Sequence, residues 1–281
     1  MLAIMGGTGI YQLPEMIIDD EQVVETPFGE PSGSVVRGRY RDHPILFLAR
    51  HGSGHRLLPH EVNYRANVFA LKAAGATMLL GLSAVGSLRQ EIEPGDLVIP
   101  EQYFDWTRGR RAQTFFGNGI AAHVSTAHPV SARLVQSVVQ AGERAGQTVH
   151  RGATYACVEG PRLGTRAESL FLRHAGCDLV GMTNIPEVFL AREAQLAYAT
   201  IGLVTDYDCW LDDPAHHVSA TGIFELYGKT LKKAFNVLQS LLRGELPEPE
   251  AENRTALQSA MLTPFESLPN DQKAWVTILR K

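Results

Sequence analysis

Hydrophobic and polar residues alternate along this chain on two length scales. Short apolar runs rich in small or β-branched residues predict buried strands, and longer segments with apolar residues on one repeating face predict helices. Strands are expected at residues 2–5, 45–48, 78–83, 97–99, 153–157 and 196–204. Helices are expected at residues 62–74, 130–145, 187–195 and 223–242, with Ser131 as a candidate cap of the second.

Strands that alternate with helices predict an α/β fold: one domain with a twisted, mixed, largely parallel sheet flanked by helices. Ligands of such folds gather beyond the carboxyl ends of the strands. The sequence GELPEPEAEN at 244–253 breaks the pattern and is typical of a polar linker. We therefore expect a domain at residues 1–243, followed by a linker and C-terminal arm at 244–281. The arm could pack on a neighbouring subunit or on its own core.

Composition and charge limit the classes of function and partner that the chain is expected to have. The 281 residues are 44% hydrophobic, and 30 acidic against 26 basic side chains give a formal charge of −4. This balance gives no reason to expect a nucleic-acid or membrane partner. Three scattered cysteines suit a reducing compartment and predict neither a disulfide framework nor a paired-cysteine metal site. The first residues contain no leader pattern, so a cytoplasmic location is expected.

Two carboxylates end the last predicted strand. The stretch LVTDYDCW, residues 203–210, follows an apolar run and presents Asp206 and Asp208 on either side of Tyr207. A second nearby acid and burial at a sheet end both raise the pKa of a carboxyl group. The pair is therefore a candidate for acid–base chemistry.

Several other strand ends carry groups that suit an anion. A glycine-rich turn, GGTGI, offers backbone amides and the Thr8 hydroxyl, and LARHGSGH offers Arg50 beside His51. Ser83 lies in GLSAVGSL, and Met182 and Thr183 lie in GMTNIPE. The expected position of these groups at one sheet edge predicts a site that holds a small anion such as phosphate.

Each motif, taken alone, is also compatible with a different function or with none. His51, His55 and His60 could bind a metal, although their spacing matches no common ligand set. Arg-His-Gly also occurs in phosphatases with a histidine nucleophile, and a non-catalytic nucleotide-binding module could use the same turns. In VEGPRLGTRAES, Thr165 and Glu168 have the spacing of a helix capping box, which needs no functional role.

Taken together, the motifs resemble the purine nucleoside phosphorylase superfamily, and within it the 5'-methylthioadenosine phosphorylase branch. The resemblance runs from residue 6 to about residue 242. It rests on the ordered segments GGTG, TPFGEPS, LARHG, PHEVNYRAN, SAVGSLRQEIEPGD, EGPRLGTRAES, GMTNIPE and ATIGLVTDYDCW.

The resemblance implies a role for each site residue. Phosphate would be held by Thr8, Arg50, His51, Ser83, Thr183 and the backbone of Ala84. Met182 would lie under the ribose, and Asp206 and Asp208 would face the purine, with Asp206 as the acid that protonates N7. Gly164 and Ala220 would lie near the base and the 5' group, where the family tends to have serine and valine. His123 would approach the 5' group bound by a neighbouring subunit.

The implied reaction is phosphorolysis of 5'-methylthioadenosine to adenine and 5-methylthioribose 1-phosphate, within purine and methionine salvage. It needs inorganic phosphate as co-substrate and neither cofactor nor metal. The implied assembly is a homotrimer, or a hexamer. An acid pair favours adenine, but a 6-oxopurine phosphorylase acting on 5'-methylthioinosine or another purine nucleoside stays open, as does a histidine phosphatase.

Overall fold

The computed structural model describes residues 1–7, 13–109, 111–211 and 220–281, apart from the side chains of 220–225. Nine strands of this part form one sheet, with the order β2-β3-β4-β1-β5-β8-β7-β6-β9. The strands are β1 (Leu2–Gly6), β2 (Met16–Gln22), β3 (Val35–Tyr40), β4 (His43–Ala49), β5 (Met78–Ser87), β6 (Leu97–Trp106), β7 (Val149–Val158), β8 (Leu179–Gly181) and β9 (Ala197–Asp206).

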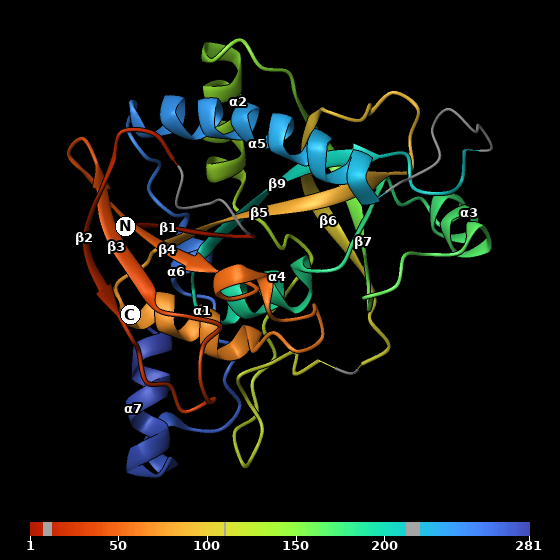
Figure 1. Cartoon of the computed structure of the whole chain (residues 1–281). Helices are drawn as coiled ribbons and strands as arrows, with labels where there is room; N and C mark the ends of the chain where they lie inside the picture. Colours follow the sequence, from red (N-terminus) through yellow and green to blue (C-terminus); the bar gives the residue numbers. More distant parts are fainter. Residues whose placement is uncertain (8–12, 110, 212–219) are drawn as a thin grey trace.

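The helices cover both faces of the sheet (Figure 1), with α2 and α5 on one side and α1 and α4 on the other. They are α1 (Tyr64–Ala73), α2 (Ala132–Arg144), α3 (Arg166–His174), α4 (Asn184–Glu193), α5 (Ala220–Leu242), α6 (Ala251–Arg254) and α7 (Asn270–Leu279), with short 3-10 turns at Ser53–His55 and Phe265–Ser267. The predicted α/β class and mixed sheet are confirmed. Three strands that the apolar pattern did not predict, β2, β3 and β8, complete the sheet.

Strand alternation explains the two layers of core. Ala3 and Met5 of β1 belong to the cluster beneath α1 and α4, whereas Leu2 and Ile4 belong to the cluster beneath α2 and α5. Successive side chains of a strand point to opposite faces, so a continuous apolar run fills both layers. Ser131 caps α2, as its position predicted, because its hydroxyl accepts the N–H of Leu134.

The second half of the sheet closes into a ring, because β5 pairs with both β8 and β9 while β6 and β7 link the other two. β8 runs antiparallel to β5, and β6 runs antiparallel to β9. The expectation that all candidate groups follow strands with one shared carboxyl edge is therefore wrong. Residues after β8 instead run back along β5, which brings Thr183 beside Ser83.

The C-terminal arm packs on its own chain. Val276 and Leu279 of α7 are buried in the cluster beneath α1, and the Trp275 ring lies 5.4 Å from that of Phe28. Arg192 of α4 donates to the Asn253 side chain in α6. A domain boundary at residue 243 and an additional contact with a neighbouring subunit remain predictions.

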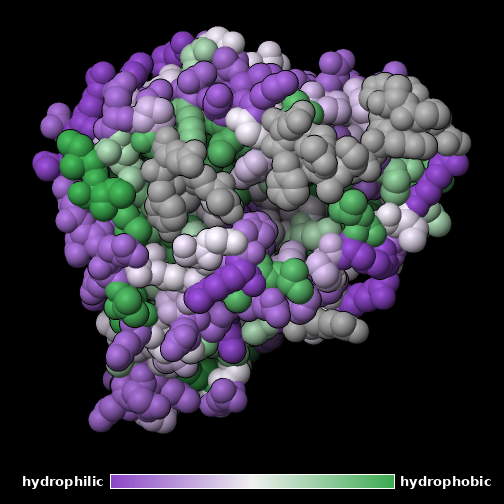
Figure 2. Space-filling model, in the orientation of Figure 1, coloured by the Kyte–Doolittle hydropathy of each residue, from purple (hydrophilic) through white to green (hydrophobic). Residues whose placement is uncertain are grey.

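The surface is mostly hydrophilic on the face shown in Figure 2, with separate hydrophobic patches between the charged and polar residues. In the described part of the chain, no helix has both the length and the apolar composition needed to cross a membrane.

Candidate functional site

Arg50 follows β4 and is almost completely buried, with 1% of its surface exposed. Its Nε and Nη2 atoms donate to the two carboxylate oxygens of Glu187 at 2.6 and 2.9 Å. Further N–H groups donate to the carbonyls of Leu82 at 2.9 Å and Met5 at 3.2 Å. Burial alone would lower the pKa of Arg50. The charge and hydrogen bonds of Glu187 outweigh this effect, so the pKa of Arg50 is raised. Four of the five guanidinium N–H groups are therefore paired within the chain, and one N–H on Nη1 has no partner among the described residues.

His51 is buried beside Arg50 and stacks on the His55 ring, with 4.3 Å between centroids. Its Nδ1 lies 2.8 Å from the carbonyl of Leu57. Because a carbonyl only accepts, Nδ1 carries the hydrogen and Nε2 holds a lone pair in the neutral ring. Burial and the nearby Arg50 charge lower the pKa of His51 to about 4. The ring is therefore neutral at physiological pH and can accept a hydrogen bond.

Ser83, Ala84 and Thr183 meet beside this pair. The hydroxyls of Ser83 and Thr183 lie 2.9 Å apart, and both residues are buried. Ala84, the next residue of β5, is exposed, and its carbonyl accepts the Ser83 hydroxyl at 3.3 Å. The Arg50 bond to the Leu82 carbonyl fixes the guanidinium next to Ser83. The structure thus brings five of the six predicted phosphate residues together, while Thr8 lies outside the described residues.

Met182 connects this cluster to the rest of the site. Its thioether lies over Gly160, where a Cβ would come within 2.4 Å of the sulfur. Gly160 also has φ +67°, a conformation that side chains rarely adopt, so the close contact requires glycine. The Met182 carbonyl accepts a hydrogen bond of 2.7 Å from Arg111.

Arg111 is a central residue that the sequence pattern did not reveal. Only 7% of it is exposed, and its guanidinium lies over the Tyr64 ring. Its N–H groups donate to the carbonyls of Met182 and Ile185, both at 2.7 Å, and of Glu159 at 3.0 Å. It therefore ties the segment after β7 to the segment after β8. Because it lies in a loop without periodicity, no local signal could have identified it.

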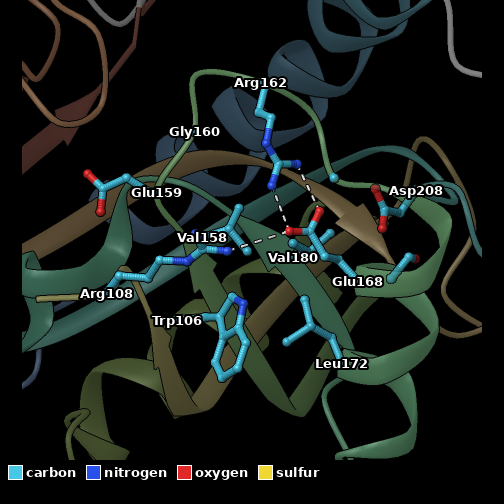
Figure 3. A pocket seen from close by; sticks show the side chains of 12 residues that line it. Trp106, Arg108, Val158, Glu159, Gly160, Arg162, Glu168, Leu172, Val180 and Asp208 are labelled. Atoms are coloured by element: carbon cyan, nitrogen blue, oxygen red, sulfur yellow. Dashed lines mark hydrogen bonds and ion pairs between the residues drawn. The ribbon is translucent and has the colours of Figure 1, made fainter.

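A pocket of about 280 Å³ lies beside Gly160 (Figure 3). It is lined by Trp106, Arg108, Val158, Glu159, Gly160, Arg162, Gly164, Glu168, Ser169, Leu172, Val180 and Asp208. In Figure 3, Glu159 lies on one side and Asp208 on the other, and Arg108 and Arg162 both point toward Glu168. Two of the predicted site residues, Gly164 and Asp208, therefore line the same pocket. Its apolar side chains suit a flat ring.

Asp206 and Asp208 form a linked pair. Asp206 accepts the Asp208 backbone N–H at 2.7 Å and the Thr205 hydroxyl at 2.7 Å. Burial raises the pKa of Asp206 despite these donors, and the charge of Asp208 adds to the effect. Burial likewise raises the pKa of Asp208. A Cβ at Gly86 would lie 2.9 Å from an Asp206 oxygen, so the absence of a side chain there makes room for the pair.

The remaining predicted residues lie elsewhere or are only partly described. His123 is exposed, and its backbone N–H donates to the Ala260 carbonyl in the arm at 2.9 Å. It is not among the residues that line the pocket. Ala220 is the first residue of α5, and its side chain lies outside the described part.

Thr165 and Glu168 form the predicted capping box at the start of α3. The Glu168 carboxylate accepts the Thr165 N–H and also pairs with Arg162, whose hydrogen bond is the main reason that the pKa of Glu168 falls to about 2. This carboxylate is therefore ionised and already paired. Across the described ranges, no group of three or more His, Cys, Asp or Glu side chains is placed to hold a metal ion.

Comparison with known proteins gives a consistent result. Residues 1–243 match the family described as the Phosphorylase superfamily. The chain is 44% identical over 273 residues to S-methyl-5'-thioadenosine phosphorylase of Geobacter sulfurreducens, with 97% of this chain and 95% of the relative covered. It is 45% identical over 250 residues to the protein of the same name from Hyperthermus butylicus, with 89% and 90% covered.

Solved structures agree. The crystal structure of a methylthioadenosine phosphorylase sourced from an antarctic soil metagenomic library has a TM-score of 0.92 and 42% identity, with 99% of this chain and 98% of that chain covered. Methylthioadenosine phosphorylase from Schistosoma mansoni in complex with adenine has a TM-score of 0.86 and 34% identity, with 93% and 98% covered. The fold class and the family resemblance predicted from the sequence are confirmed.

Proposed function

Because this chain belongs to the phosphorylase superfamily, we propose that it catalyses the phosphorolysis of 5'-methylthioadenosine to adenine and 5-methylthioribose 1-phosphate. The relatives with 44 and 45% identity carry the name of this activity. One observation supports the proposal most strongly. A cluster suited to an anion adjoins Met182, whose thioether lies on Gly160, and Gly160 lines the same pocket as Asp208, one of two linked acids whose pKa values are raised by burial.

Phosphate binds at the end formed by Arg50, His51, Ser83 and Thr183, with the Ala84 backbone and Thr8. The Arg50 charge attracts the dianion, and its free N–H together with the two hydroxyls can donate to oxygens of the anion. His51, whose Nε2 accepts, suits the O–H of hydrogen phosphate. Fixed donors hold the nucleophile in line with C1' of the ribose and so reduce the entropic cost of attack.

Bond cleavage proceeds as a phosphate oxygen attacks C1' and the C1'–N9 bond breaks. The electron pair of that bond passes to the purine, and a proton from Asp206 to N7 neutralises the developing charge. Burial keeps a fraction of Asp206 protonated at higher pH than an ordinary aspartate. Asp208 orients Asp206 through its backbone N–H and presents its own carboxyl to the pocket.

The other predicted residues complete the nucleoside site. Met182 lies under the ribose, Gly164 contributes backbone and space near the base, and Ala220 lies near the 5' group. His123 reaches the 5' group of a nucleoside bound to a neighbouring subunit of a homotrimer, which accounts for its exposed position on the single chain. The enzyme works in the cytoplasm, with inorganic phosphate as co-substrate and no resident cofactor.

Parallel assays of base release test the proposal. The purified protein is incubated with 5'-methylthioadenosine or 5'-methylthioinosine, each with and without phosphate, and the products are separated by chromatography. We expect adenine release that depends on phosphate. Hypoxanthine release alone would replace the adenine assignment by the 6-oxopurine one, and failure to release either base would refute phosphorolysis of these nucleosides.

A further inference from the structure

Ser169 lines the pocket but has no place in the chemistry described so far. It lies in the first turn of α3, and 1% of its surface is exposed. Its Oγ is buried without a hydrogen-bond partner in the described part of the chain. A buried hydroxyl without a partner costs about 1–3 kcal/mol, so such atoms in a native structure usually bind a ligand or water.

We infer that the Ser169 hydroxyl hydrogen-bonds the substituent at position 6 of the purine and is a determinant of base affinity. This inference rests on the proposed function, since it assumes that the pocket holds a purine. It adds a neutral contact, capable of both donating and accepting, to the two acids already assigned to the base.

The Ser169 hydroxyl lies near Asp208, at the end of the pocket that we assign to the base. The hydroxyl lies close enough to the Asp208 carboxyl to counteract part of the burial effect on the pKa of that acid, although it completes no hydrogen bond with it. Glu159 also has a buried oxygen that meets no partner in the described ranges, but its other oxygen accepts a hydrogen bond from Arg111, which also donates to the Met182 carbonyl. Figure 3 places Glu159 across the pocket from Asp208, so the unpartnered Glu159 oxygen belongs to the ribose side.

Local structure fixes the hydroxyl in place. The capping box between Thr165 and Glu168 sets the start of α3, and the Ser169 backbone N–H donates to the Thr165 carbonyl at 3.0 Å. Glu168, the neighbouring polar group, is occupied by Arg162. Gly164 offers no side chain to this wall. Among the described lining residues at this end, Ser169 is therefore the one whose buried side-chain oxygen completes no hydrogen bond.

The chemistry of position 6 fits a hydroxyl. An exocyclic amino group has two N–H donors, and one carboxyl oxygen cannot accept both in good geometry. Ser169 can accept the second. A 6-oxo group needs a donor, which the same hydroxyl provides after rotation. We therefore expect Ser169 to support 6-amino and 6-oxo purines alike, while specificity between them resides in the acids.

Base binding tests this directly. Dissociation constants of adenine, hypoxanthine and unsubstituted purine are measured by calorimetry for the wild type and Ser169→Ala. Removal of one neutral hydrogen bond should raise the dissociation constants of adenine and hypoxanthine by about 3- to 10-fold. Purine has no substituent at position 6, so its binding should change less than about twofold. An equal loss for all three bases, or no loss for adenine, would overturn the inference.

Additional variants separate a lost contact from a damaged fold. Ser169→Thr retains a hydroxyl and should restore most of the preference for adenine over purine. Ser267→Ala, a matched change at an exposed position in the arm, should leave all three constants unchanged. Since these measurements need no turnover, they remain decisive if wild-type phosphorolysis fails. Conversely, normal turnover of 5'-methylthioadenosine with unaltered base discrimination in Ser169→Ala would refute only the Ser169 assignment.

Discussion

The two ends of the site are built on different principles. At the end proposed to bind phosphate, the charged groups of Arg50 and Glu187 are paired with each other in the interior. At the end proposed to bind the base, burial raises the pKa values of both acids, and the Ser169 hydroxyl has no hydrogen-bond partner among the described residues. The first arrangement holds groups rigidly for a small anion of fixed geometry. The second leaves proton-transfer and hydrogen-bonding capacity available to the ligand.

The largest expected effect comes from removing the acid at the base end. Asp206→Asn retains the shape of the side chain but cannot deliver a proton to N7. We expect kcat/KM for 5'-methylthioadenosine to fall by about 10²- to 10⁴-fold, the usual contribution of general acid catalysis. The KM for phosphate should change little, because the anion is proposed to bind at the other end. A variant with near wild-type turnover would remove Asp206 from the acid role.

The pH profile tests the same acid in the wild type. A general acid acts in its protonated form, and burial raises the pKa of Asp206 above its ordinary value of 3.8. The rate kcat/KM for the nucleoside should therefore be highest on the acidic side and fall as pH rises through that raised pKa. The fall should be absent from Asp206→Asn. Asp208→Asn, as the comparison, should retain a fall whose midpoint is displaced.

At the end proposed to bind phosphate, removing the partner of the buried Arg50 charge should destabilise the fold. Glu187→Ala leaves the Arg50 guanidinium buried without its carboxylate, a change that typically costs about 3–5 kcal/mol of unfolding free energy. Urea denaturation measures it. The double variant Arg50→Met with Glu187→Leu removes both charges and should recover much of the stability but not phosphate binding. If the double variant were as unstable as the single one, charge burial would not be the cause.

Helix α4, which contains Glu187, also carries a carboxyl group that makes the free energy of unfolding depend on pH. Glu193, at the end of α4, accepts the Thr114 hydroxyl and the Phe115 N–H, and burial raises its pKa from 4.5 to about 7. The folded state therefore binds this proton more tightly than the unfolded state. The resulting stabilisation is full below pH 4.5 and disappears as pH rises through about 7. A shift of this size corresponds to at most about 3 kcal/mol.

Denaturation at several pH values, from 4 to 8, tests this prediction. In Glu193→Gln, the amide resembles the protonated acid, because its NH₂ group can donate to the Thr114 hydroxyl oxygen. The variant should therefore lose the decline between about pH 5 and 8 that is due to this carboxyl. An unchanged decline would assign the pH dependence to other groups.

Sequence patterns predict the strands and helices whose apolar residues form a clear local pattern. The run at 197–206 is largely apolar because β9 is buried on both faces, so its end, and with it Asp206, could be predicted. β2 is largely exposed and reads MIIDDEQ, which contains too few apolar residues to mark a strand. β8 has three residues, too short for a periodic pattern.

The residues of the site can likewise be predicted only where the local sequence carries a signal. Residues at strand ends, such as His51 and Asp208, could be proposed from position and residue type. Glu187 lies 137 positions from its partner Arg50, and Arg111 acts through carbonyls of distant segments. Their roles depend on which loops the closed ring of strands brings together, and no local pattern contains that information.

The smallest expected effect concerns the ion pair at the rim of the base end. Arg162 donates to both oxygens of Glu168, but the arginine side chain is 60% exposed, in contrast to the 1% of Arg50. Water can solvate either charge when the partner is removed, so exposed pairs contribute little to stability. Glu168 also keeps its capping bond to the Thr165 N–H without Arg162. Arg162→Ala should therefore leave the urea midpoint unchanged within error, whereas Glu168→Ala, which removes one of the two bonds of the capping box, should lower it measurably. A large loss in Arg162→Ala would show that the rim, like the phosphate end, depends on a paired charge.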